Sequence, residues 1–87
     1  MEGIDKELHN IFGKVLRELR TQIGFTQEQL GFECNLDRTF ISLLERGLRQ
    51  PTLTTLFTLS DKLMVPASVI IKKVEDAYQD QHPVKKP

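Results

Sequence analysis

The chain has 87 residues, a formal net charge of zero and 39% hydrophobic residues, which is typical of one small globular domain. No apolar run approaches the ~20 residues that a membrane-spanning helix needs, and the polar first ten residues do not resemble a signal peptide. Neutral net charge argues against strong non-specific binding to nucleic acid, but a local basic surface can still bind DNA. Cys34 is the single cysteine, so an internal disulfide is excluded. This is compatible with a location in the reducing cytoplasm.

Residues 6–23 predict a first helix, because apolar side chains recur there at helical spacing. These side chains are Leu8, Ile11, Phe12, Val15, Leu19 and Ile23. Gly13 lowers the helix propensity by roughly 1 kcal/mol relative to alanine without breaking the pattern. Gly24 is expected to end the helix.

Residues 26–45 predict two short helices joined by a tight turn. Thr26 can cap the first helix, and Gln29 three residues later completes a capping box. Asn35 tolerates the left-handed backbone that the turn needs. Asp37 can cap the second helix, where its carboxylate accepts free amides.

The second of these helices, residues 38–45, has two distinct faces when its residues are placed about 100° apart. The inward side carries Phe40, Ile41, Leu44 and Glu45, and the outward side carries Arg38, Thr39, Ser42 and Leu43. A helix anchored on one face can project polar N-terminal side chains from the other. That arrangement is what reading base edges in a major groove requires.

Two further helices are predicted before a polar tail. Thr52 can cap the fourth helix, and Pro66 stops it and suits the first position of a fifth. The expected apolar stripes are Leu53, Leu56, Phe57, Ser60 and Leu63, and then Ala67, Ile70, Ile71, Val74, Ala77 and Tyr78. We expect one domain over residues 1–78 and a disordered tail over residues 79–87. No window predicts a strand, so the expected fold class is all-α with five helices.

The pattern resembles the XRE-type, lambda-repressor-like helix-turn-helix DNA-binding family over roughly residues 10–72. The matching features are Thr26-Gln27, Leu30-Gly31, Asn35, Ile41, Leu44, Glu45-Arg46-Gly47, Pro51-Thr52-Leu53 and Leu63-Met64-Val65-Pro66. The run NLDRTFISLLERG is particularly similar to controller proteins of restriction–modification systems. The resemblance implies a five-helix lambda-repressor-like domain, with the helix-turn-helix at helices two and three. Such a domain binds double-stranded DNA as a homodimer on an inverted repeat.

The resemblance, together with the outward face of the 38–45 helix and the arginines that follow it, predicts which residues contact DNA. They are Gln27, Arg38, Thr39, Phe40, Ser42, Leu43, Arg46 and Arg49. Arg38 can donate a bidentate pair of hydrogen bonds to a guanine, whereas Gln27 is expected to bond a phosphate together with helix N-terminal amides. Leu43 can meet a thymine methyl group or extend the core, and Phe40 is expected to be mainly structural.

Two further groups of residues are expected to hold the assembly together. In the family, a glutamate such as Glu45 often pairs with an arginine late in the first helix, here Arg20, because a half-buried charge needs a partner. The fifth helix carries more apolar side chains than a small core uses. The residues predicted to form a homodimer contact are Val69, Ile70, Val74 and Tyr78. The alternative is that all of them belong to the core.

No nucleophile–base pair, metal-ligand spacing or glycine-rich phosphate loop is present, so no enzyme, metal or cofactor is predicted. The predicted function is transcriptional regulation in the cytoplasm, associated with the nucleoid and away from membranes. Regulation would act through competition with, or recruitment of, RNA polymerase. Three alternatives stay open at this point: a prophage-type repressor, an antitoxin, and a protein-interaction module that has lost DNA binding.

Overall fold

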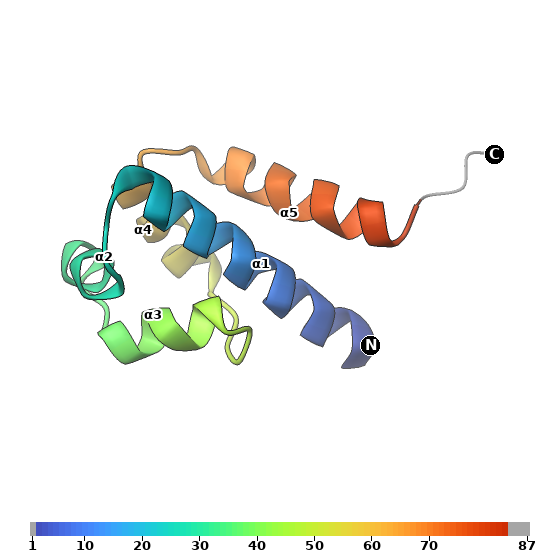
Figure 1. Ribbon diagram of the computed structural model, residues 1–87, viewed down its shortest axis with the longest axis horizontal. Coiled ribbons are helices and arrows are strands. Elements are labelled where there is room, and N and C mark those ends of the chain that lie inside the picture. The colour runs from blue at the N-terminus through green and yellow to red at the C-terminus, as the bar shows by residue number, and fades with distance from the viewer. Residues whose placement is uncertain (1, 84–87) are drawn as a thin grey trace.

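The structure is a computed structural model that describes residues 2–83, and over this range it holds five helices and no strand. The helices are α1 (Glu2–Ile23), α2 (Gln27–Cys34), α3 (Arg38–Glu45), α4 (Leu53–Leu63) and α5 (Ala67–Gln81). The predicted all-α fold is therefore confirmed. Figure 1 shows α1 as a long central helix, with α5 along one side and α3 along the other.

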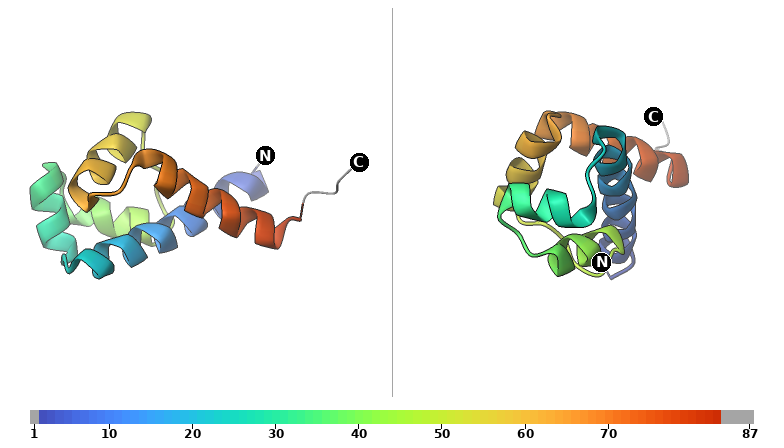
Figure 2. Two further views of the ribbon diagram at one scale, coloured as in Figure 1. Left: turned by 90° about the horizontal axis from the view of Figure 1, so that it is seen from above. Right: turned by 60° about the vertical axis from the view of Figure 1, so that its left-hand side comes forward.

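The core gathers apolar side chains from all five helices. Its buried members are Ile11, Phe12, Val15, Leu16, Leu19, Leu30, Cys34, Ile41, Leu44, Leu56, Leu59, Leu63 and Ile70. Leu16 is buried although it lies outside the predicted stripe of α1, because α3, α4 and α5 contact this helix from several sides. The two further views in Figure 2 show how α1 to α4 close around this centre.

Both ends of α2 and the start of α3 form as predicted. The Gln29 amide donates to Thr26 Oγ1 at 3.0 Å, and the Thr26 amide donates to Gln29 Oε1 at 2.8 Å. Asn35 adopts the left-handed backbone at φ 55°, and the Thr39 amide donates to Asp37 Oδ1 at 2.9 Å. Local hydrogen bonding thus decides where the helix-turn-helix begins and turns.

The N-terminal half of α1 and the C-terminal half of α5 lie side by side beyond the rest of the fold (Figure 1). His82 Nε2 lies 2.6 Å from Glu7 Oε2, and the ring of Tyr78 stacks on His82 with centroids 4.7 Å apart. These contacts explain why α5 continues to Gln81. The predicted tail is therefore wrong for residues 79–81, which are helical, and its residues 84–87 lie outside the described part of the chain.

The buried face of α4 differs from the predicted stripe. Thr52 caps the helix as expected, because the Thr55 amide donates to its hydroxyl at 3.1 Å. Leu53 and Phe57, however, are 72% and 57% exposed, while Leu59 is fully buried. The cause is rotational: α1, α2 and α5 all contact α4, and the side that they cover is centred between Leu56 and Leu59.

Helices α4 and α5 meet at a sharp bend. Met64 ends α4 with a left-handed backbone at φ 59°, and Pro66 caps α5 instead of occupying its first helical position. None of the helices in residues 2–83 is long and apolar enough to cross a membrane by itself. Together α4 and α5 have sufficient length and apolar composition, but they are bent by 106°.

Candidate nucleic-acid interface

The inward face of α3 fixes this helix to the body of the protein. Ile41 and Leu44 are fully buried in the core, and Phe40 packs half-buried against it. The burial of Ile41 and Leu44 confirms the predicted inward face of α3. The anchored helix can therefore present its other face without depending on a ligand for its position.

The outward face of α3 is open to solvent at its N-terminal end. Arg38 and Thr39 are exposed, and Ser42 and Leu43 further along the helix are half-buried. The Asp37 cap occupies the Thr39 amide but leaves the Thr39 hydroxyl without an intramolecular hydrogen bond in the described part of the chain. These side chains can therefore approach a groove from one direction.

Two further basic side chains follow the end of α3 in the chain. Arg46 and Arg49 are exposed, as Arg38 is. Among residues 3–83 none of these three arginines forms an ion pair. Their guanidinium groups are therefore available to phosphate oxygens or base edges, which are planar acceptors that arginine binds well.

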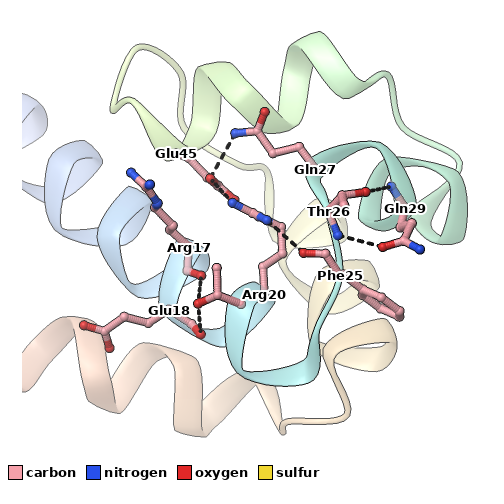
Figure 3. A network of polar contacts seen from close by, with 9 residues as sticks. Arg17, Glu18, Arg20, Phe25, Thr26, Gln27, Gln29 and Glu45 are labelled. Atoms are coloured by element: carbon pink, nitrogen blue, oxygen red, sulfur yellow. Dashed lines mark hydrogen bonds and ion pairs between the residues drawn. The ribbon is translucent and has the colours of Figure 1, made fainter.

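The last residue of α3 is held by a polar network (Figure 3). Arg20 Nε donates to Glu45 Oε2 at 2.5 Å, and Arg20 Nη2 donates to Glu45 Oε1 at 3.0 Å. Arg20 Nη1 also donates to the carbonyl oxygen of Phe25 at 2.8 Å. The side chains of Arg20 and Glu45 are only 11% and 4% exposed, so the expected ion pair is present and well shielded.

Gln27 also belongs to this network, which the sequence did not indicate. Its side-chain amide donates to Glu45 Oε1 at 3.0 Å and its side chain is half-buried (Figure 3). Beside it lies an open hollow, lined by Arg20, Thr21, Gly24, Phe25, Thr26, Gln27, Glu28 and Arg38. The free amides of the first turn of α2 also belong to this region. Binding of a phosphate by Gln27 stays a prediction. The hydrogen bond to Glu45 already orients the Gln27 side chain.

The predicted dimer contact on α5 needs a correction. Ile70 is 1% exposed because it fills the core where α5 crosses the other helices, so its side chain is unavailable to a partner. Val74 and Tyr78 are half-buried against the same core, and only Val69 is exposed. The predicted set therefore includes one core residue, and its other members stay a prediction.

Several other exposed apolar side chains lie on α4, at its C-terminal cap and on α5. We call Leu53, Phe57, Met64 and Ile71 the α4–α5 apolar surface; each is about half exposed or more. Next to it is a largely apolar hollow whose lining includes Leu53, Leu56, Ile71 and Val74. Leu53, Phe57 and Met64 are four and seven residues apart, and this helical spacing is the sequence signal that could have identified a second stripe.

The described residues hold no candidate metal centre. No group of three or more His, Cys, Asp or Glu side chains among them could hold an ion. Cys34 is buried, and desolvation raises the pKa of its thiol above the ordinary value, which favours the unreactive protonated form. His9 instead lies 3.1 Å from Gln50 Oε1, which ties α1 to the segment after α3.

Sequence comparison agrees with this geometry. Residues 16–70 match the helix-turn-helix family. The chain belongs to this family. A relative is the control protein C.BamHI of Bacillus amyloliquefaciens, which is 41% identical over 56 residues, covering 63% of this chain and 69% of that protein. The matched region contains the whole helix-turn-helix unit, α2 and α3, with its anchoring arginine in α1.

Two solved structures of restriction–modification controllers have the same fold as this helix-turn-helix protein. C.AhdI from Aeromonas hydrophila is 37% identical with a TM-score of 0.69, covering 71% of this chain and 94% of that one. C.Esp1396I, solved as a tetramer with its natural 35-base-pair operator, is 33% identical with a TM-score of 0.72. That match covers 79% of this chain and 91% of the other.

Proposed function

We propose that this protein is a sequence-specific regulator of transcription that binds double-stranded DNA as a homodimer on an inverted-repeat operator. The observation that carries the proposal is the outward face of α3, which combines exposed Arg38 and Thr39 with a fully buried anchor at Ile41 and Leu44. A rigid helix with free donors at its N-terminal end fits a major groove.

The distribution of charge supports this function although the net charge is zero. Arg38, Arg46 and Arg49 lie on or just beyond α3 and are not neutralised by ion pairs within the described residues. In this proposal Arg38 reads a base, and Arg46 and Arg49 bind phosphates. Gln27, Thr39, Phe40, Ser42 and Leu43 complete the contact set.

A second copy of the chain is the partner that we propose for the α4–α5 apolar surface. Exposed apolar area of this kind commonly marks an interaction site. Binding two half-sites in successive major grooves requires a two-fold dimer whose α3 helices lie about 34 Å apart. The apolar hollow beside Leu53 and Ile71 gives such a contact a concave component. Tyr78, seven residues after Ile71, continues the same side of α5 in this proposal.

We further propose the role of a restriction–modification controller, because C.BamHI and C.AhdI are named as control or controller proteins. A controller, a prophage-type repressor and an antitoxin differ in the genes beside their operators. If the DNA site that this protein binds lies upstream of restriction and modification genes, the first of these roles is supported. A site beside phage or toxin genes would contradict it.

RNA polymerase is the proposed functional target of the bound dimer, through blocking or recruitment at a promoter in the cytoplasm. On α2, next to α3, Phe32 is 83% exposed and lines a hollow together with Glu28 and Glu33. A protein bound to neighbouring DNA could reach this surface. Transcription in vitro from a promoter that carries the bound site, with and without the protein, shows whether the protein activates or represses transcription.

Selection from a random duplex library tests the main proposal. We expect the full chain to enrich an inverted repeat with half-sites about one helical turn apart. Gel shifts on the enriched duplex and on a scrambled duplex, at one salt concentration, then give the specificity ratio. A protein that enriches no sequence and shifts neither duplex would instead be an interaction module that has lost DNA binding.

A further inference from the structure

Gly13 lies where α1 crosses the C-terminal end of α3. A β carbon at this position would lie 2.5 Å from the carbonyl oxygen of Glu45 and 2.6 Å from that of Leu44. Both atoms belong to the backbone, so no change of side-chain rotamer could relieve the overlap. The absence of a side chain at Gly13 is therefore a condition for the observed seating of α3 on α1.

The same end of α3 meets α1 at two other points. Arg20, two helical turns after Gly13, holds the Glu45 carboxylate. Gly47, just beyond α3, adopts a φ of +74°, and a β carbon there would lie 2.1 Å from Asn10 Oδ1. The last turn of α3 and the loop after it are therefore packed directly on α1.

The N-terminal end of α3 is held differently. It is joined to α2 by the tight turn, where a β carbon on Gly31 would lie 2.7 Å from the carbonyl oxygen of Leu36 and 3.3 Å from the amide nitrogen of Arg38. The C-terminal end of α3 thus rests on the backbone of α1, with one side-chain hydrogen bond from Gln27 of α2, and the N-terminal end rests on α2. A β carbon at Gly13 would press on the C-terminal end of α3 alone, so we expect α3 to tilt about its start.

We propose that Gly13 is a positioning residue for DNA reading, because it sets the depth at which the C-terminal end of α3 sits and hence the angle of this helix in the groove. The proposal rests on the proposed DNA-binding function. Hydrogen bonds to base edges tolerate only small errors in distance and direction. Long arginine side chains can still follow phosphates after a tilt, so non-specific binding is affected less.

The Gly13→Ala variant of the full chain tests this role, with Gly3→Ala as the matched control. Gly3 lies on the same helix, and a β carbon there would have no heavy atom within 4 Å among the neighbours considered. Dissociation constants are measured for the selected operator and for a scrambled duplex at one salt concentration. Circular dichroism and thermal unfolding establish that each variant is folded at the temperature used.

We expect Gly13→Ala to weaken operator binding about tenfold or more, which is about 1.4 kcal/mol, and to change binding of the scrambled duplex less than about threefold. Backbone amide NMR shifts should change at Ser42–Glu45 more than at Arg38 and Thr39. Equal losses on both duplexes, or no loss on either, would overturn the positioning role. If the wild type itself selects no site, the proposed function fails, and the amide shifts alone decide whether Gly13 seats α3.

A second variant covers the case in which Gly13→Ala does not fold, even in trimethylamine N-oxide, which favours the folded state. Arg20→Lys loosens the same end of α3 without adding bulk, because lysine cannot form the bidentate pair with Glu45. We expect it to lose operator affinity in excess of scrambled-duplex affinity. Parallel losses on the two duplexes would contradict the proposal in this background as well.

Discussion

Arg20 and Glu45 are joined by two hydrogen bonds, at 2.5 and 3.0 Å, although they lie 25 positions apart in the chain. The pair connects α1 to the last residue of α3, and Gln27 of α2 adds a third hydrogen bond to the same carboxylate. A buried ion pair contributes little net stability, because desolvation offsets the attraction between its charges. Its effect here is to fix three helices relative to one another at the base of the proposed DNA-reading face.

Removing one member of this pair is expected to be far more costly than replacing both. Glu45→Ala leaves the Arg20 guanidinium shielded and without its counter-charge, so we expect the free energy of unfolding to fall by about 3–5 kcal/mol. The combination of Arg20→Met with Glu45→Leu should recover most of that loss. Urea unfolding measures both changes. A loss below about 1 kcal/mol for Glu45→Ala would contradict the shielding seen at this pair.

Arg38→Ala tests base reading. We expect it to weaken operator binding by about 1–3 kcal/mol while leaving binding to a scrambled duplex nearly unchanged, because a bidentate contact to a base depends on sequence. Gel shifts with both duplexes measure the difference. Lys73→Ala on α5 is the control, since this lysine is exposed and lies far from α3 in the chain. Losses of equal size on the two duplexes would mean that Arg38 binds a phosphate.

Arg46→Gln and Arg49→Gln test phosphate binding. Each substitution should reduce the slope of log affinity against log salt by about 0.9, because one fewer counterion is released for each lost phosphate contact. The specificity ratio should hardly change. Fluorescence anisotropy between low and moderate salt gives the slopes. A variant whose slope equals that of the wild type has lost no phosphate contact, and its arginine then lies outside the interface.

Leu53→Glu tests the proposed dimer surface. Leu53 is 72% exposed, so the variant should fold normally but dissociate to a monomer, because the charge would be desolvated in the contact. Sedimentation at micromolar concentrations measures the change. Phe32→Glu is the control, since it places the same charge on another exposed apolar residue, which lies on α2. A wild type that stays monomeric at high micromolar concentration would exclude the dimer contact.

Stability should also fall at alkaline pH because of Cys34. Burial raises the pKa of its thiol in the folded state, mainly through desolvation. The folded state therefore favours the protonated thiol. This contribution is fully present below the pKa of the unfolded thiol and is lost as the pH rises through the folded value. Urea unfolding from neutral to alkaline pH measures it, with Cys34→Ala as reference. Identical pH profiles for the two proteins would rule out this effect.

Local rules in the sequence determined much of this protein. The caps at Thr26, Asp37 and Thr52 predict where three helices begin, because each depends on hydrogen bonds that span only two or three residues. The periodicity of residues 38–45 also predicts which face of α3 is buried. Family resemblance supplied the long-range partner of Glu45, which no local pattern could have identified.

Tertiary packing decided the rest. Periodicity gives the angle of a residue about its own helix axis, but it does not say which neighbouring helices cover that angle. For this reason Leu59 is buried and Leu53 exposed on α4, and Ile70 lies in the core while Ile71 remains about half exposed. In the sequence Gly13 is only a weak helix former. In the fold, the absence of a side chain at Gly13 lets α3 lie against the backbone of α1, which is a contact between residues far apart in the chain.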